Sequence, residues 1–279
     1  MAVITLTTDW GIRDPYVAAF KGLLLRKLQS LQIVDVSHSI QPHDRLAAAY
    51  VLSNSYGYFP DGSVHYVGLN SLEGARVEKG SDYLIVESEK KFFIGADCGI
   101  FAMVLLDKPR KIWRLAVPRN ADQEELQLFL AENIIELLKG TPPSELGDEH
   151  ASLEEAYFTK AVGDNSGIRG SVIYIDGFGN VVFNITRGFF ESHRNERGFS
   201  ILLRRASYKI SEISKRFDTV ADGDLLALFN QDGYLEVAVN KGNASQLIGL
   251  KMFDPILIEF HDHPHRQDEL HAGEGIGVS

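Results

Sequence analysis

The sequence predicts two domains: an α/β N-terminal domain with a mainly parallel central sheet, and a smaller antiparallel all-β barrel as the C-terminal domain. In the first half, apolar and β-branched runs alternate with segments of helical period, in the order strand–helix–strand–helix–strand. In the second half, short strands follow one another between glycine-rich turns. The expected division is residues 1–165, 166–262, and a polar, histidine-containing tail at 263–279.

The N-terminal half opens with a buried strand at residues 3–7, in which every side chain is apolar or β-branched. A helix over residues 15–28 follows, because Val17, Phe20 and Leu24 recur on one face. The other elements expected in this half are strands at 33–36 and 64–67, a helix at 46–58, a hairpin of 83–87 with 91–95, a strand around Trp113, and a helix at 123–139.

The C-terminal half contains turn signals such as DGFGN, QDGY and NKGNAS between short apolar runs. We expect strands at 171–175, 180–185, 199–203, 225–229, 235–239 and 256–259. The tail carries alternating histidines, His261, His263 and His265, and then His271. They suggest either a metal site or a frayed terminus, and the lack of apolar anchors favours the frayed terminus. No metal site is therefore expected.

Composition excludes several classes of protein. The 279 residues are 44% hydrophobic, and 28 Lys and Arg stand against 38 Asp and Glu, a formal net charge of -10. That charge argues against nucleic acid or an anionic membrane as the main partner. The single cysteine, Cys98, excludes an intrachain disulfide framework and fits a reducing compartment. No signal peptide or apolar run of membrane-spanning length is visible. We expect a cytoplasmic protein.

The bend after the first strand reads Thr8-Asp9-Trp10-Gly11. The carboxyl end of a strand in an α/β sheet is where ligands bind. A carboxylate there accepts two hydrogen bonds from a vicinal diol such as a ribose. The alternative is that Asp9 caps the following helix.

A second candidate is the turn Asp176-Gly177-Phe178-Gly179-Asn180. It is either an ordinary hairpin turn with Phe178 in the core, or a site where an exposed ring stacks on a planar ligand. Asn180 offers both a donor and an acceptor to an amine or carboxylate. A third stretch, EVAVNKGNAS at residues 236–245, ends in a turn whose backbone amides suit a purine edge.

Together these motifs resemble the family of S-adenosylmethionine-dependent hydroxide adenosyltransferases, which are related to fluorinases and chlorinases. TTDWG-x-x-DPYVAAFKG is similar to the family's opening TTDFG-x-x-DPYVG-x-x-KG, and IVDVSHSIQPHD, YIDGFGN and AVNKGNAS resemble later blocks. The resemblance implies an α/β domain followed by a β-barrel. It also implies a homotrimer, with each nucleoside site between the N-domain of one subunit and the C-domain of its neighbour.

Carried over by position, the resemblance implies a role for each matched residue. Asp9 holds the ribose diol, Asp176 and Asn180 face the methionine moiety, and Phe178 stacks on or beside the adenine. Asn243 and Ala244 read the adenine through the backbone. Trp10 and Asn70 complete the ligand-binding candidates.

The loop after the third strand departs from the family pattern. Family hydrolases carry a segment like VDPGVG-x-x-RR, whose Asp and Arg act with a later His to orient the attacking water. Here Arg76 matches the Arg, but the Asp position falls on Leu69 or Asn70, and Glu125 stands where the His is expected. Arg76 and Glu125 are therefore the catalytic candidates.

Two further residues are possible substitutes for the missing base. Glu73 belongs to the same loop, and His65 to the strand that enters it. A structural role is favoured for His65, since a lone histidine forms no catalytic constellation.

The implied reaction is hydrolysis of S-adenosylmethionine to adenosine and L-methionine by attack of water or hydroxide on the ribose C5′. It is expected to be slow, and to need no cofactor. The alternative is a catalytically inactive relative that binds S-adenosylmethionine or adenosine as a trimeric sensor or scaffold.

Overall fold

The computed structural model describes residues 2–69, 82–106, 108–156, 159–203 and 209–261. The chain divides into two compact units, residues 1–158 and 159–279. The predicted boundary at 165/166 places residues 159–165 with the first unit. The structure places them with the second, because β8 (Val162–Gly163) pairs with β9 (Gly167–Ile175).

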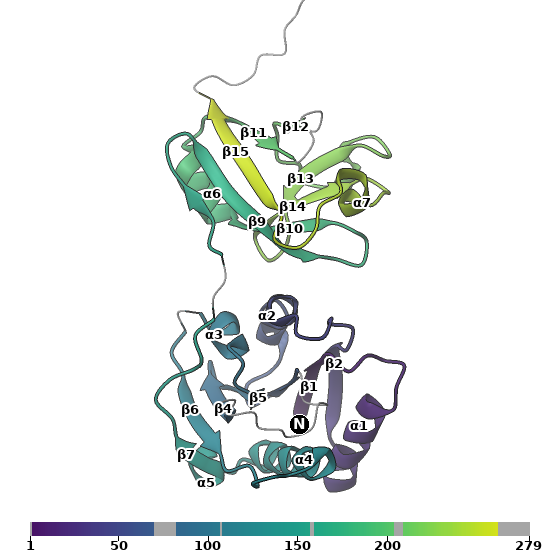
Figure 1. Ribbon diagram of the computed structural model, residues 1–279, viewed down its shortest axis with the longest axis vertical. Coiled ribbons are helices and arrows are strands. Elements are labelled where there is room, and N and C mark those ends of the chain that lie inside the picture. Colours follow the sequence, from purple (N-terminus) through teal and green to yellow (C-terminus); the bar gives the residue numbers. More distant parts are fainter. Residues whose placement is uncertain (1, 70–81, 107, 157–158, 204–208, 262–279) are drawn as a thin grey trace, which may run out of the picture. The chain divides into compact units, whose positions relative to one another are not determined.

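The first unit is built on a seven-stranded mixed sheet with the strand order β2-β1-β3-β5-β4-β6-β7 (Figure 1). The strands are β1 (Val3–Thr8), β2 (Gln32–Ser37), β3 (Val64–Gly68), β4 (Tyr83–Ser88), β5 (Lys91–Ala96), β6 (Lys111–Leu115) and β7 (Gly147–Glu149). The first three and β5 run parallel, and the later strands pair antiparallel. The predicted parallel core and the predicted hairpin are both confirmed.

Helices cover both faces of this sheet. Figure 1 shows α2 (Arg45–Ser53) and α3 (Ile100–Val104) on one side and α4 (Gln123–Lys139) on the other. Side chains alternate along each strand, so Ile4, Leu6 and Tyr66 pack with α4 and α1 (Tyr16–Lys27). Their neighbours on the opposite face pack with α2 and α3, and include Val67, Leu84, Val86 and Phe93.

The helix predicted at residues 46–58 is shorter in the structure. It ends at Ser53 and is followed by the 3₁₀ turn η1 (Tyr56–Tyr58). The hydroxyls of Ser53 and Ser55 donate back to the carbonyls of Ala49 and Val51. Such bonds compete with the helical ladder, which explains the early end. A short helix, α5 (Pro143–Leu146), precedes β7.

The second unit is a nearly closed antiparallel sheet, with the order β12-β11-β15-β9-β10-β14-β13 and β8 attached to β9. Its remaining strands are β10 (Val181–Thr186), β11 (Gly198–Leu202), β12 (Lys209–Ile210), β13 (Leu225–Phe229), β14 (Tyr234–Val239) and β15 (Pro255–His261). A bond of 2.7 Å from Ser214 N–H to Ala227 O joins the segment after β12 to β13. All six predicted strands and the barrel architecture are confirmed.

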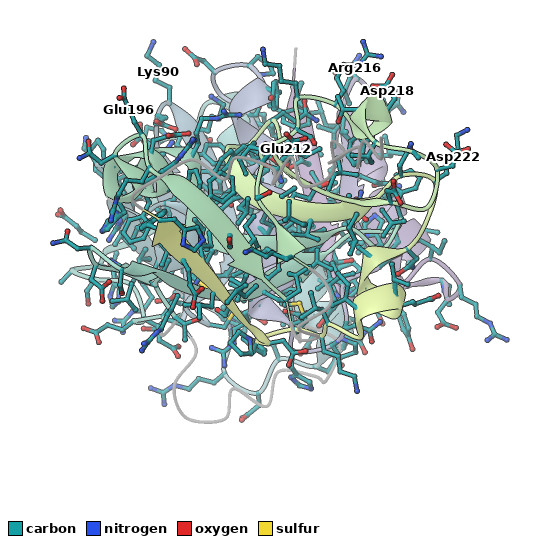
Figure 2. All side chains as sticks on the ribbon, turned by 90° about the horizontal axis from the view of Figure 1, so that it is seen from above. Lys90, Glu196, Glu212, Arg216, Asp218 and Asp222 are labelled. Carbon is teal, nitrogen blue, oxygen red and sulfur yellow. The ribbon has the colours of Figure 1, made fainter. Side chains whose placement is uncertain are left out.

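Side chains of the barrel strands fill one main core, with Val172, Phe183, Phe199, Leu235 and Ile258 among its buried members. The helix α6 (Arg187–Arg194), which the sequence analysis did not predict, adds Phe190 to that core. Two short elements, η2 (Phe217–Thr219) and α7 (Ala244–Ile248), lie in connections. Figure 2 shows Arg216 and Asp218, which form an ion pair, projecting outward from the ribbon.

No helix in the described part of the chain is long and apolar enough to cross a membrane.

Candidate functional site

The first candidate group lies where β1 ends. Thr8 is the last residue of β1, and the chain bends at Asp9 and Trp10. Thr8 pairs with Gly68 of β3, and the Asp9 N–H lies 3.5 Å from the Gly68 carbonyl oxygen. The half-buried Asp9 thus lies at the carboxyl end of β1, where α/β sheets commonly bind ligands, and its contact with a ligand stays a prediction. The capping alternative is wrong, because Pro15 occupies the N-cap position of α1, with no side-chain capping bond.

His38 contacts this bend from the end of β2. Its Nδ1 lies 2.7 Å from Thr8 Oγ1, and its carbonyl oxygen accepts a 2.7 Å bond from Gly11 N–H. On the other side of the ring, Nε2 lies 3.0 Å from Asp35 Oδ1, and Asp35 Oδ2 pairs with Lys21 at 2.5 Å. Burial raises the pKa of Asp35, but the Lys21 and His38 contacts outweigh it and hold that pKa below its usual value.

Trp10 points into the core. It is 4% exposed and packs edge-on against Phe20 and Tyr66, with centroid distances of 5.5 and 5.9 Å. A Cβ at Gly68 would come within 2.8 Å of both Trp10 and Tyr66, so the glycine leaves the space that the indole ring occupies. The predicted contact between Trp10 and a ligand stays a prediction.

Another carboxylate lies at the carboxyl end of β5. Asp97 is 6% exposed, and its Oδ2 accepts a 2.7 Å bond from Glu154 N–H. Burial raises the pKa of Asp97, opposed by that bond and by one from Gly99 N–H. Burial likewise raises the pKa of the neighbouring Cys98 thiol, as is typical of a structural cysteine. Asp97 directly follows an apolar strand in the sequence, and this position could have identified it as a candidate site residue.

Glu125 lies in the first turn of α4, where its exposed carboxylate completes a capping box. Its Oε2 accepts a 3.0 Å bond from Asp122 N–H, while Asp122 Oδ1 accepts a 2.9 Å bond from Glu125 N–H. This pair stabilises the helix start. The catalytic role of Glu125 stays a prediction.

His65 is fully buried in β3. Its Nδ1 lies 2.7 Å from Thr5 Oγ1, its ring stacks on Phe93, and Nε2 has no hydrogen-bond partner among the described residues. Burial, followed by the charge of Lys91, lowers the pKa of His65 to about 3. The ring is therefore neutral at pH 7, and this environment supports the structural interpretation.

The second candidate group is the turn between β9 and β10. Asp176 Oδ1 accepts bonds of 2.9 and 2.8 Å from the N–H groups of Phe178 and Asn180, and Oδ2 accepts 2.9 Å from Asn180 Nδ2. These bonds fix Asp176 and the 7%-exposed Asn180 relative to each other. The Phe178 ring is 80% exposed, so the alternative that places it in the core is wrong.

The third candidate stretch packs directly against that turn. Asn243 is the N-cap of α7, and its Oδ1 accepts a 2.8 Å bond from Gln246 N–H. Ser245 N–H donates to Gly179 O at 2.9 Å, which joins the two turns. Gly179 has φ +85°, and a Cβ there would lie 2.2 Å from the Asn243 side chain. The structure therefore brings Asp176, Asn180 and Asn243 together, with Ala244 buried behind them.

Glu236 of β14 is a buried carboxylate that the sequence analysis did not single out. It is 6% exposed, and Asn230 Nδ2 donates to its Oε2 at 3.2 Å. Burial raises its pKa, the Asn230 bond opposes the rise, and the charges of Asp176 and Asp232 add to it. Glu236 thus contributes to the electrostatic environment of the Asp176 turn.

Several predicted residues lie outside the described part of the chain, namely Asn70, Glu73, Arg76, His263, His265 and His271. Within the described ranges, no group of three or more His, Cys, Asp or Glu side chains is arranged to hold a metal ion.

Two protein-family models match this chain. The model of the SAM hydroxide adenosyltransferase N-terminal domain matches residues 4–147, and that of the C-terminal domain matches residues 170–257. This chain belongs to the SAM hydroxide adenosyltransferase family. The resemblance seen in the sequence motifs is therefore confirmed.

Full-length relatives agree with this assignment. The (R)-S-adenosyl-L-methionine hydrolase of Thermus thermophilus is 28% identical, over 92% of this chain and 99% of its own. The (R)-S-adenosyl-L-methionine hydrolase of Methanocaldococcus jannaschii is 26% identical, over 92% and 95%. The crystal structure of an uncharacterized conserved protein from Thermotoga maritima matches with a TM-score of 0.80 at 26% identity, covering 92% and 99%.

Leu69 is one of the two positions, with Asn70, on which the family's Asp is expected to fall. The residue is 3% exposed and packs in the core between the sheet and the α2–α3 layer. An apolar side chain in that position cannot accept a proton from water.

Proposed function

We propose that this chain hydrolyses S-adenosylmethionine to adenosine and L-methionine. The main support is the half-buried Asp9, which lies at the carboxyl end of β1, where α/β sheets bind ligands. In addition, relatives that match almost the whole chain are named S-adenosyl-L-methionine hydrolases. In the reaction, a water oxygen bonds to the ribose C5′ while the C5′–S bond breaks. The electron pair of that bond goes to sulfur, and the water proton is lost to a base or to solvent.

This chemistry depends on placement more than on an external reagent. The attacking oxygen carries or develops negative charge and the leaving sulfonium is positive, so charge is neutralised in the transition state. A pocket that excludes bulk water and holds both groups in line favours the reaction. We propose that no metal or other cofactor takes part, since the sulfonium is already an activated leaving group.

Each group of contacts suggests a part of the substrate. Asp9 is suited to the ribose diol, because a carboxylate accepts two hydrogen bonds in a bidentate manner. Asp176 and Asn180, fixed by their mutual bonds, suit the methionine ammonium and carboxylate. The exposed Phe178 ring is available to stack on adenine, and Asn243 with Ala244 presents backbone groups to the purine edge.

We propose that the chain acts as a homotrimer, with each site shared between the first unit of one subunit and the second unit of its neighbour. Two observations support this arrangement. The candidate residues are divided between the two units, and each unit exposes a large apolar side chain next to its motif. These are Ile12, at 79% exposure, and Phe178, at 80%.

We propose slow turnover, because the described residues that can stand at the family's Asp and His positions, Leu69 and Glu125, have other roles in the fold. Leu69 lies in the core, and Glu125 binds Asp122 in the capping box. The same observation favours a second candidate function, in which the trimer binds S-adenosylmethionine or adenosine without turnover, as a sensor or scaffold. A cytoplasmic location is part of this proposal, supported by the single cysteine.

The first test is incubation of the protein with S-adenosylmethionine and chromatographic detection of adenosine and methionine over hours, beside calorimetry with adenosine. Asp9→Asn should weaken adenosine binding about 10- to 100-fold, as expected for loss of a charged hydrogen-bond acceptor. Asp61→Asn is the control, because Asp61 is an exposed carboxylate paired only with Lys90 among the described salt bridges. Equal affinities for wild type and Asp9→Asn would reject the assignment of Asp9. Tight binding without products would favour the sensor or scaffold.

A further inference from the structure

The β1–β2 pairing contains an irregularity immediately before the Asp9 bend. Leu6 pairs with Asp35, but the next residue, Thr7, pairs with Ser37, so Val36 is an extra residue in β2. A β-bulge of this kind re-aims the side chains that follow it, and bulges are common next to active sites. His38 lies two residues after Val36, and its ring reaches Thr8 at the end of the neighbouring strand.

His38 holds the bend at both of its ends. Before the bend, its Nδ1 contacts Thr8 Oγ1 at 2.7 Å, and after the bend, its carbonyl oxygen accepts Gly11 N–H at 2.7 Å. Asp9 and Trp10 are the two residues between these attachments. Thr8 is fully buried and His38 is 5% exposed, so water does not compete for the side-chain bond.

The hydrogen bonds also indicate the state of the ring. Trp10 N–H donates to Thr8 Oγ1 at 3.4 Å, so the Thr8 hydroxyl is free to donate its own hydrogen to His38 Nδ1. The proton of a neutral ring then sits on Nε2, 3.0 Å from Asp35 Oδ1. Nε2 has no well-aligned hydrogen bond among the described residues, although the Asp35 carboxylate lies within 3.0 Å of it.

We propose that His38 is a positioning residue, which holds the Asp9 bend in the conformation that binds the nucleoside. Asp35 and Lys21 extend the contact to the surface and hold the ring in place. This inference rests on the proposed function for its ligand, adenosine, but the positioning itself is a property of the ligand-free chain. His38 does not touch the reacting atoms in this scheme and is not a catalytic residue.

The chain offers a matched control for this contact. Thr5 and His65 form a second buried pair, on β1 and β3, with the same Oγ1–Nδ1 distance of 2.7 Å. Thr5→Val and Thr8→Val therefore each remove a hydroxyl from β1 and leave a buried imidazole nitrogen without its partner. Thr8→Val also removes the 3.4 Å contact from Trp10 N–H, and the His38 substitutions below isolate the part played by the imidazole. Only the Thr8 pair is attached to the Asp9 bend.

The experiment compares Thr8→Val with Thr5→Val in two measurements. Amide hydrogen exchange in the ligand-free protein should show Gly11 exchanging about tenfold faster in Thr8→Val only. Calorimetry should show the adenosine Kd rising about tenfold in Thr8→Val and less than about twofold in Thr5→Val, at comparable loss of thermal stability. Equal effects of the two variants on both measurements would overturn the proposal.

Substitutions at His38 separate positioning from a general loss of packing. In His38→Asn the side-chain oxygen occupies the place of Nδ1 and accepts from Thr8, so the adenosine Kd should stay within about threefold of wild type. His38→Leu removes the acceptor and should raise it about tenfold. Equal Kd values for these two variants would reject the role of the Nδ1 contact. Failure of the wild type to bind adenosine would reject the proposed function instead, and Gly11 exchange would still decide whether His38 positions the bend.

Discussion

At the scale of single residues, hydrogen bonds inside the protein show which polar atoms of the predicted site residues are already used within the fold. Asn243 Oδ1 is engaged by Gln246 N–H and Ser245 Oγ, and its carbonyl oxygen accepts from Leu247 N–H, so both oxygens of this residue stabilise the start of α7. Glu125 is engaged by the N-terminus of its own helix. The sequence could not separate these cases, because caps, turns and ligand sites use the same residue types.

The capping box gives the first prediction. Glu125→Gln keeps an acceptor for Asp122 N–H but loses the charge near the helix N-terminus, and it should lower the unfolding free energy by less than about 1 kcal/mol. If Glu125 also activates water, the same change should abolish S-adenosylmethionine turnover and leave adenosine affinity unaltered. Asp122→Ala is the control, which removes the cap from the other side and should cost about 0.5–2 kcal/mol. A turnover rate unchanged in Glu125→Gln would assign the residue to the cap alone.

His65 gives a pH prediction. Its pKa is about 3 in the folded protein, against an ordinary value of about 6.5, so between these values the unfolded chain binds more protons than the folded one. This residue's contribution to stability is therefore complete above pH of about 6.5, and falls by up to about 1.4 kcal/mol per pH unit as the pH drops toward 3. Urea unfolding at several pH values should show a shallower dependence in His65→Gln. An identical slope in that variant would contradict the low pKa.

At the scale of elements, the sequence predicts what local signals define. The bounds of α4, Gln123–Lys139, were predicted correctly, because Asp122 caps its start and Gly140, in a left-handed conformation, ends it. Helix α6 was not predicted, since its eight residues, RGFFESHR, are too short to establish a helical period. The contact between the turns at Gly179 and Asn243 was also beyond prediction, because it joins residues far apart in the chain.

That contact between two turns gives a prediction with an internal control. Gly179 has φ +85°, and its Cβ position lies 2.2 Å from Asn243, whereas Gly177 has no atom within 4 Å of its Cβ position. Gly179→Ala should destabilise the second unit by about 1–3 kcal/mol, through strain and overpacking, and weaken adenosine binding. Gly177→Ala should change neither thermal stability nor affinity appreciably. Equal melting temperatures for the two variants would show that the turns are not held together as described.

At the scale of the whole molecule, the sequence motifs led to the family and both folds, whereas the assembly depends on the family resemblance. Strand periodicity and turn residues predicted a mainly parallel sheet followed by an antiparallel barrel, and the structure has a mixed sheet with a parallel core and an antiparallel barrel. Periodicity describes how one chain buries its own apolar face, and carries no information on which surfaces of separate subunits meet. The division of the candidate residues, with Asp9 in the first unit and Asp176 in the second, is what makes the assembly testable.

Hybrid assemblies provide that test. Asp9→Asn inactivates the first-unit part of a site, and Asp176→Asn inactivates the second-unit part, so neither homotrimer should bind S-adenosylmethionine tightly. If each site takes one part from each of two neighbouring subunits, any one site of a random trimer from equal co-expression is intact with a probability of about one quarter. Calorimetry should then find about one quarter of the wild-type S-adenosylmethionine-binding capacity, at wild-type affinity. If each subunit built its site alone, every site in the mixture would carry one of the two substitutions, and no capacity would return. Light scattering on the same sample measures the mass of the assembly. A trimer mass is expected if sites are shared between subunits, and a smaller mass would show that the subunits failed to assemble.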